Sequence, residues 1–360
     1  MNKFPYQWTL KDAQFTKDKG KVFSCFACGG GSTMGYKLAG FDVIGCNEID
    51  PRMNKVYVEN HHPKFNYLEP IQEFKLRKDL PSELYSLDVL DGSPPCSSFS
   101  SSGNRGEDWG KEKKFREGQA MQVLDTLFFD FIDLAKELQP KVVIAENVKG
   151  LLTGEAISYV RRIYDEFDKA GYYCQHILLN AQYMGVPQQR ERVFFLCLRK
   201  DLAEPFLYQY DMFTQRPRIE MVFKEEPIQI SEFTDYKGKE VTSPVLRNLW
   251  ENRQYGDKDQ SEANMRLFGK PSNFGQSYVY QNQVCWTLTA KESSIIHFDE
   301  PRILSEHEVN CVSTFPQDYN YMEESPHYIA GMSVPPVMMA QVASNVYEQW
   351  LSKIPKATNI

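Results

Sequence analysis

The sequence lacks the features that would place a protein in a membrane or in an oxidising compartment. No apolar run approaches the roughly 18 residues of a membrane-spanning helix, and the longest evident run covers only 193–198. The N-terminus has no long apolar stretch of the signal-peptide type. Eight cysteines in 360 residues are too few for a disulfide scaffold. We therefore expect a cytoplasmic protein with reduced thiols and no membrane partner.

Excess positive charge, internal repeats and low-complexity tracts are also missing. Lys and Arg total 41 against 48 Asp and Glu, so the formal net charge is −7. This balance argues against a protein that binds nucleic acid over its whole surface, but it is compatible with a local basic cleft. Cys25 and Cys28 form a Cys-x-x-Cys pair, but no second ligand pair follows at zinc spacing, so no metal site is predicted. With 42% hydrophobic and 25% charged residues, the composition is that of an ordinary globular protein.

The first half of the chain alternates short apolar runs with amphipathic stretches. This alternation predicts an α/β fold with a mostly parallel sheet covered by helices on both faces. Ligands of such sheets bind beyond the carboxyl ends of the strands. The predicted strands are 21–26, 41–46, 87–90, 141–145, 175–179 and 193–198, and the predicted helices are 33–39, 124–138 and 156–170.

The alternation is lost after the first 200 residues. Residues 201–284 are polar and irregular, with more acidic than basic side chains, and the chain later ends in an apolar helix predicted over 337–351. We therefore predict one large domain formed by 1–200 and 285–360, with a smaller lobe inserted between these two parts.

A glycine-rich turn links the first predicted strand to the first predicted helix. It spans 26–31 with the sequence Phe-Ala-Cys-Gly-Gly-Gly, and glycines there let a ligand approach the backbone beside a helix N-terminus. Glu48 ends the second predicted strand, where a carboxylate can accept hydrogen bonds from ribose hydroxyls. Turn and acid together favour a nucleoside cofactor. The alternative is a tight turn with a capping acid.

Two further strand ends carry residues suited to covalent and acid–base chemistry. Cys96 follows Pro94 and Pro95 on a stiff loop, which gives a thiol the exposure and fixed backbone that a nucleophile needs. Glu146 ends the strand 141–145, where burial would raise its pKa and make it a proton donor near neutral pH. The alternatives are an inert loop cysteine and an acid that caps the following segment.

Two arginines precede the last predicted strand of the first half. Arg190 and Arg192 alternate, so an extended backbone would direct both guanidinium groups to one face. Such a pair suits a carboxylate, a phosphate or a carbonyl oxygen. The alternative is a solvated edge with one ion pair to Glu191.

Together and in this order, these motifs resemble the DNA cytosine-5 methyltransferase family over nearly the whole chain, from about Phe23 to Trp350. The resembling segments are 26–35 for the cofactor loop, 92–100 for the Pro-Cys motif, 146–148 for Glu-Asn-Val, 188–192 for Gln-x-Arg-x-Arg, 302–308 for Arg-x-Leu-Thr-x-x-Glu and 331–334 for Gly-Asn-Ser-Val. The chain departs from the family pattern where Cys28 replaces a glycine, Ser97 a glutamine, Ser305 a threonine and Met332 an asparagine.

The resemblance implies a Rossmann-like methyltransferase domain that uses S-adenosylmethionine as methyl donor and cytosine as acceptor. In the implied reaction Cys96 attacks C6 of the base and Glu146 protonates or hydrogen-bonds N3. Arg192 would hold the carbonyl oxygen of the base, with Arg190 in support. The implied cofactor-binding residues are Phe26, Cys28, Gly29, Gly30, Gly31, Glu48, Ile49, Glu69, Pro95 and Ser333.

The resemblance also implies the partners. The target would be a cytosine flipped out of double-stranded DNA, covered by a closing loop at 97–119, with 201–284 reading the DNA sequence. We expect a monomer, with a cognate restriction endonuclease as a functional partner. One alternative is a tRNA cytosine-5 methyltransferase, whose Cys-Phe-Thr motif we do not find. Others are a dehydrogenase, which would not explain the Pro-Cys motif, and a DNA-binding relative without catalysis, which the intact catalytic residues disfavour.

Overall fold

The computed structural model describes residues 4–95, 112–113, 122–123, 126–154, 156–211, 214–270 and 275–355. Contacts divide the chain into two compact units. The sheet unit comprises Gln14–Leu179, Glu191–Val222 and Met339–Ile360, and the second unit comprises Met1–Ala13, Asn180–Arg190 and Phe223–Met338. The division predicted from the sequence, with boundaries near 200 and 284, stays a prediction.

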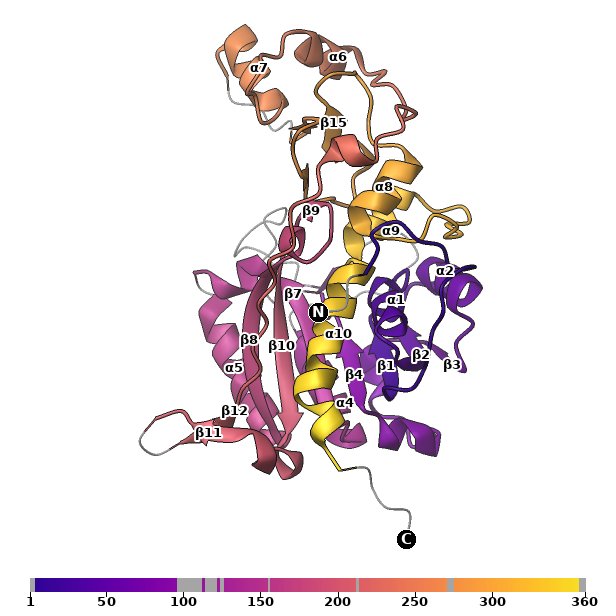
Figure 1. Ribbon diagram of the computed structural model, residues 1–360, viewed down its shortest axis with the longest axis vertical. Helices are drawn as coiled ribbons and strands as arrows, with labels where there is room; N and C mark the ends of the chain where they lie inside the picture. Colours follow the sequence, from indigo (N-terminus) through magenta and orange to yellow (C-terminus); the bar gives the residue numbers. More distant parts are fainter. Residues whose placement is uncertain are drawn as a thin grey trace. The chain divides into compact units, whose positions relative to one another are not determined.

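The sheet unit is built on seven strands in the order β3-β2-β1-β4-β7-β10-β8 (Figure 1). The strands from β3 to β7 pair in parallel, and β10 runs antiparallel to β7. The sheet is therefore mostly parallel, as predicted, and its strand order reverses between β1 and β4, where such sheets bind ligands. The bounds are β1 Lys21–Cys25, β2 Asp42–Glu48, β3 Phe65–Leu68, β4 Val89–Gly92, β7 Val142–Val148, β8 Tyr172–Asn180 and β10 Glu191–Arg199.

Helices cover both faces of this sheet, because successive side chains of each strand point to opposite sides. Phe23 and Cys25 of β1 belong to the core cluster that also contains residues of α4 and α5. Ser24, between them, instead donates a hydrogen bond to Asp91, which also accepts one from Tyr36 of α1. The helices are α1 Gly31–Leu38, α2 Pro51–His61, α3 Ile71–Phe74, α4 Leu127–Leu138, α5 Ala156–Lys169 and α10 Pro336–Gln349, the last of which spans the unit boundary.

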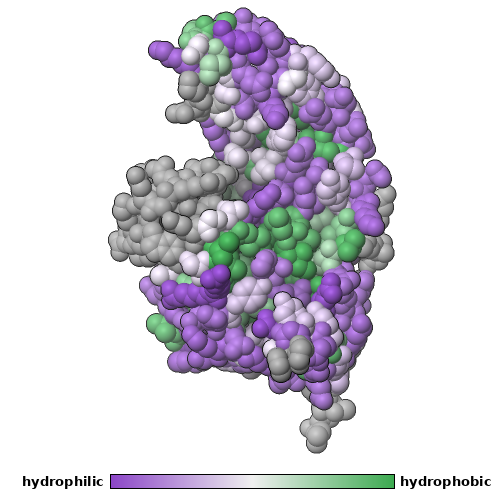
Figure 2. Space-filling model, turned by 90° about the vertical axis from the view of Figure 1, so that its left-hand side faces the viewer, coloured by the Kyte–Doolittle hydropathy of each residue, from purple (hydrophilic) through white to green (hydrophobic). Residues whose placement is uncertain are grey.

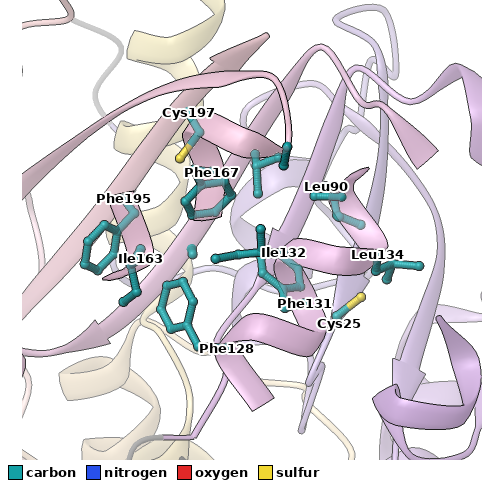
Figure 3. Packing of buried hydrophobic residues seen from close by; sticks show 14 of the residues in the cluster. Cys25, Leu90, Phe128, Phe131, Ile132, Leu134, Ile163, Phe167, Phe195 and Cys197 are labelled. Carbon is teal, nitrogen blue, oxygen red and sulfur yellow. The ribbon is translucent and has the colours of Figure 1, made fainter. Parts of the chain in front are cut away.

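Aromatic side chains fill the core between the sheet and helices α4 and α5 (Figure 3). Phe128 of α4 lies edge-on to Phe195 of β10, with ring centroids 5.5 Å apart, and edge-on to Phe167 of α5 at 6.4 Å. Burying one such ring stabilises the fold by about 1.5–3 kcal/mol. This packing fixes the strands whose carboxyl ends carry the candidate site.

The edge strand β8 is accompanied by the segment 218–222. The side-chain amide of Gln175 donates to the carbonyl oxygen of Ile219 at 2.9 Å and accepts from its N–H at 3.1 Å. On α10, Gln349 makes the same reciprocal pair with the backbone of Glu220, at 2.7 and 3.0 Å. A cavity of about 440 Å³ lies here, lined by Gln175, Ile177, Tyr208 and 218–222. Nearby, β11 Leu207–Gln209 pairs antiparallel with β12 Gln215–Pro217, and elsewhere β5 Glu112–Lys113 pairs with β6 Gln122–Val123.

Among its described residues, the second unit contains short strands and the α-helices α6 to α9. The strand β9 Gln188–Gln189 pairs in parallel with β14 Cys285–Trp286, and β13 Ser277–Val279 pairs in parallel with β15 Ile295–His297. The helices are α6 Pro244–Glu251, α7 Gln260–Phe268, α8 Glu306–Ser313 and α9 Pro326–Met332.

A buried carboxylate organises the second unit. Glu308 is fully buried and accepts hydrogen bonds from Arg302 at 2.8 and 3.1 Å. It also accepts from the backbone N–H of Ser305 and from the hydroxyl of Thr234, and His297 lies 3.2 Å away. The Ser305 hydroxyl accepts the N–H of Glu308 in return, which completes a capping box at the start of α8. The segment 302–308 is thus a structural motif in this unit.

Figure 2 shows one face of the molecule, on which hydrophilic residues predominate and hydrophobic residues gather in several separate places. In the described part of the chain, no helix combines the length and the apolar character that crossing a membrane requires. The same residues contain no group of three or more His, Cys, Asp or Glu side chains arranged to hold a metal ion.

Candidate active site

The turn between β1 and α1 has an unusual backbone. Phe26, Cys28 and Gly30 have φ angles of 55°, 46° and 80°, in the left-handed region that favours glycine. A Cβ atom on Gly30 would lie 2.1 Å from Nε2 of His61, so no other residue fits there without a shift. The predicted Gly29, Gly30 and Gly31 therefore form a compact turn that leads into the N-terminus of α1.

Glu48 at the end of β2 clamps this turn. Its Oε2 accepts the N–H of Cys28 at 2.7 Å, and its Oε1 accepts the N–H groups of Ile49 and Asp50, each at 2.9 Å. Burial raises the pKa of Glu48, and these backbone hydrogen bonds oppose that rise. A carboxylate offers about four acceptor positions, so three bonds leave capacity for a ligand hydroxyl. The structure thus shows Glu48 holding the turn, and its predicted binding of a ribose stays a prediction.

Three other predicted cofactor residues, Phe26, Ile49 and Glu69, follow the strands β1, β2 and β3. Phe26 and Ile49 are half-buried, and the Phe26 ring packs on Phe131 with centroids 6.3 Å apart. Glu69 follows β3, where its N–H donates to the carbonyl oxygen of Glu48 at 3.1 Å. Its carboxylate pairs with Arg77 at 3.1 Å. The predicted apolar and acidic residues therefore lie at the carboxyl ends of β1, β2 and β3.

Glu146 and Arg192 form an ion pair at the carboxyl end of β7. Nε of Arg192 lies 2.8 Å from Oε1 of Glu146, and both side chains are largely buried. The register places Arg192 opposite Val148 and Phe194 opposite Glu146, so the paired residues are diagonal neighbours on one face. Burial lowers the pKa of Arg192, and the Glu146 carboxylate opposes this. We expected apolar surroundings for Glu146, and the structure instead gives it a guanidinium partner.

Asn147 anchors the segment that leads to Cys96. Its Nδ2 donates to the carbonyl oxygen of Pro94 at 3.0 Å, and its Oδ1 accepts the N–H of Val148 at 2.9 Å. Pro95 is half-buried at the end of this described segment. Cys96 and the predicted closing loop 97–119 lie outside the described residues, apart from the backbone of 112–113.

Arg190 has different surroundings from those we expected. It is 2% exposed and donates to the carbonyl oxygens of Leu288, Gly331 and Ser333 at 2.9–3.0 Å, all within the second unit. The backbone is not a continuous strand at Arg190, whose carbonyl accepts the N–H of Ala181. The alternation from which we predicted one shared face for Arg190 and Arg192 therefore does not apply. Ser333, predicted as a cofactor residue, is one of these acceptors.

Our reasoning from the sequence gave no function to three polar residues near these strand ends. Asn147 belongs to the Glu-Asn-Val motif, but nothing in the sequence indicated its hydrogen bond to the carbonyl oxygen of Pro94. His61 is buried, with Nε2 3.3 Å from the carbonyl oxygen of Gly29, and burial lowers its pKa well below the usual range. Asp91 is a charged residue in an otherwise apolar strand, which is a signal that could have been followed.

A match to one family model covers most of this chain. A family model described as C-5 cytosine-specific DNA methylase matches residues 20–348. The type II methyltransferase M.FnuDI of Fusobacterium nucleatum is 38% identical over 183 residues, which are 51% of this chain and 48% of that protein. M.NgoPII of Neisseria gonorrhoeae is 36% identical over 190 residues, 52% of this chain and 50% of that protein. The chain thus spans about half the length of these curated relatives.

Longer matches have lower identity. M.Eco47II of Escherichia coli is 28% identical over 334 residues, which are 88% of this chain and 75% of that protein. Among solved structures, a Spodoptera frugiperda DNMT2 mutant has a TM-score of 0.61 and 17% identity, and covers 91% of this chain and 99% of its own. At this identity the structural match shows a shared fold.

Proposed function

Because this chain belongs to the family of C-5 cytosine-specific DNA methylases, we propose that it transfers the methyl group of S-adenosylmethionine to C5 of cytosine in double-stranded DNA. The observation that carries this proposal is the Glu146–Arg192 pair beside the Asn147–Pro94 hydrogen bond. Together these contacts bring an acid, a guanidinium group and the segment before Cys96 to one strand end.

The residues at the ends of β1 and β2 fit the proposed cofactor. The carboxylate of Glu48 is fixed by three backbone N–H groups and keeps acceptor capacity for a ribose hydroxyl. Phe26 and Ile49 are half-buried apolar side chains that can pack on an adenine. The turn 28–31 and Pro95 would line the rest of the pocket, with Glu69 and Ser333 as further candidates. When bound, S-adenosylmethionine supplies an electrophilic methyl group.

In the proposed mechanism Cys96 acts as the nucleophile. Its thiolate forms a bond to C6 of cytosine, and the electron pair displaced from the C5–C6 double bond makes C5 nucleophilic. After C5 is methylated it loses its proton to a base. The electron pair of that C–H bond then re-forms the double bond and expels the Cys96 thiolate. The cycle returns Cys96 as the thiolate, and the methyl donor would leave as a neutral thioether that keeps the electron pair of the broken carbon–sulfur bond.

Glu146 and Arg192 would hold the base during these steps. Glu146 would donate to, or share a proton with, N3, which withdraws electrons from C6 and assists attack. Arg192 uses Nε for Glu146 and Nη1 for the carbonyl oxygen of Glu191 at 2.8 Å. Its Nη2 has no partner among the described residues and can donate to the carbonyl oxygen of the base. In this proposal Arg190 acts through the backbone carbonyls it binds.

The proposal includes the way in which the target is reached. C5 of cytosine is hidden in a duplex, so the base has to be flipped out at a cost of a few kcal/mol. We propose that 97–119 closes over the base and that 201–284 reads the sequence around it. We further propose that the protein acts as a monomer and is paired functionally with a restriction endonuclease, since several relatives are named type II methyltransferases.

Methyl transfer to nucleic acid tests the proposal directly. S-adenosylmethionine with a labelled methyl group is incubated with the protein and mixed-sequence duplex DNA, with tRNA in parallel and Cys96→Ser as control. The expected result is 5-methylcytosine in the DNA and none with the variant. Label in tRNA alone would show that the substrate is RNA and would contradict the proposal for DNA. Cofactor binding without label in either would indicate a non-catalytic relative and overturn the proposal.

A further inference from the structure

Asp91 is the penultimate residue of the apolar strand β4, directly before the segment 92–95 that leads to Cys96. Its side chain is 1% exposed. The Ser24 hydroxyl donates to Oδ2 at 2.7 Å, and the Tyr36 hydroxyl donates to Oδ1 at 3.1 Å. Both donors are themselves buried. Burying a carboxyl group costs free energy unless hydrogen bonds compensate for the lost water, so the partners of Asp91 show which elements it joins.

The two donors come from the elements that carry the cofactor turn. Ser24 is the penultimate residue of β1 and pairs with Asp91 in the parallel register, and Tyr36 lies on α1. The turn 26–31 runs between these two elements. Asp91 therefore connects the strand that leads to the nucleophile with both ends of the turn that would bind the methyl donor.

We propose that Asp91 is a positioning residue for methyl transfer, which fixes the segment before Cys96 relative to the cofactor turn through its hydrogen bonds with Ser24 and Tyr36. This inference rests on the proposed function. In a reaction whose rate depends on alignment, loosening this connection lowers turnover more than it weakens binding.

The charge state of Asp91 adds a measurable signature. Burial raises the pKa of Asp91 to about 7; the hydrogen bonds from Ser24 and Tyr36 oppose this rise, and the nearby Glu146 carboxylate adds to it. The other titratable groups that face it are Cys25 on β1, Tyr36 on α1 and Tyr57 on α2. Burial raises the pKa of each of these three well above its usual value, so they stay neutral near pH 7. Among the groups named here, Asp91 is therefore the one that changes its charge near pH 7.

Asp91→Asn tests the inference, since the amide keeps one acceptor oxygen and cannot ionise. We measure kcat and KM for S-adenosylmethionine between pH 6 and 8, with duplex DNA as acceptor. The expected result is a fall in kcat of roughly tenfold or more, a KM that changes much less, and loss of the pH dependence centred near pH 7. Tyr36→Phe removes one of the two bonds and should lower kcat by a smaller factor while keeping the pH dependence.

Asp88→Asn is the matched control. Asp88 precedes β4 at the opposite end and also joins neighbouring strands, because it accepts the N–H of Lys21 and the ammonium group of Lys141, each at 2.7 Å. Its replacement should lower thermal stability without changing kcat or the pH profile. An Asp91→Asn enzyme with wild-type kcat and pH profile, or with only the changes seen for Asp88→Asn, overturns the inference. Wild-type protein that transfers no methyl group to DNA overturns the proposed function and the inference together.

Discussion

Two buried carboxylates, one in each unit, have opposite surroundings. Glu308 in the second unit accepts hydrogen bonds from Arg302, Ser305 and Thr234, with His297 also in contact. Glu146 in the sheet unit is paired with Arg192. The first group has used its acceptor capacity within the protein, whereas the second keeps capacity for a ligand. Both carboxylates are buried, so burial does not distinguish them. The number of hydrogen bonds that each already accepts from the protein separates the structural carboxylate from the candidate catalytic one.

Replacing Glu308 and Glu146 in turn by glutamine tests this difference. Glu308→Gln has the largest expected effect, which is on stability. The amide nitrogen would replace one acceptor among several donors, and the buried Arg302 would lose its buried counter-ion and keep only the more exposed Glu300. We expect the free energy of unfolding to fall by about 3–5 kcal/mol. Urea unfolding followed by circular dichroism measures it. A loss no larger than that of Glu146→Gln would contradict the distinction.

Glu146→Gln should affect activity more than stability. The amide oxygen can still accept from Nε of Arg192, but the charge of this largely buried guanidinium group loses its counter-ion. We expect the unfolding free energy to fall by about 1–3 kcal/mol, which is less than for Glu308→Gln because fewer hydrogen bonds are lost. Loss of the proton donor should lower methyl transfer by about 10²–10³-fold. Initial rates on duplex DNA and an unfolding curve of the same sample give both numbers. Near-normal turnover would remove Glu146 from the proposed mechanism.

The pH dependence of stability should also differ between the carboxylates. Asp91 keeps its proton in the folded protein up to a pKa of about 7, whereas the unfolded chain loses it near pH 4. Stability from Asp91 is therefore present at low pH and falls as the pH rises from 5 to 7, by on the order of 2 kcal/mol. Hydrogen bonds from His297 and Arg302 hold the pKa of Glu308 well below its usual range, so Glu308 contributes no slope there. Unfolding of wild type and Asp91→Asn at each pH tests this, and equal slopes would refute it.

The smallest expected effect on stability comes from relief of backbone strain. Cys28 and Thr314 both have positive φ angles, 46° and 57°. Cys28→Gly should stabilise the protein by up to about 1 kcal/mol, because relief of the strain exceeds the entropy cost of glycine. Thr314→Gly should destabilise it, since the Thr314 hydroxyl accepts the N–H of Val337 at 3.1 Å. The melting temperatures of the two variants, compared with that of the wild type, test both expectations. If both variants are stabilised, the hydrogen bond between Thr314 and Val337 contributes little to stability.

The sequence was sufficient for much of the sheet unit and insufficient where contacts are distant. The strands and helices with clear periodicity were found, including α5 and α10 within one or two residues. The segment from α2 to α3 was missed, because β3 has only four residues and the Asp50–Pro51 start of α2 was not followed as a helix signal.

The candidate site was predicted by residue type more than by contact. The positions of Glu48, Glu146 and Arg192 at strand ends follow from the sheet and were anticipated. The hydrogen bonds of Arg190 were not, since their acceptors lie about 100 residues or more away along the chain. No local pattern encodes such partners. The functions of Cys96, Glu146, Arg192 and the cofactor residues stay predictions that the experiments above address.

The reciprocal amide bonds of Gln175 and Gln349 have a consequence for association between molecules. An exposed edge strand offers a row of backbone groups on which a strand from another chain can assemble. At β8 the segment 218–222 is bonded through side chains, so it accompanies the edge without extending the ladder as a regular strand. The β8 edge of the sheet therefore offers no simple template for a further strand, which disfavours edge-to-edge association on this side of the sheet.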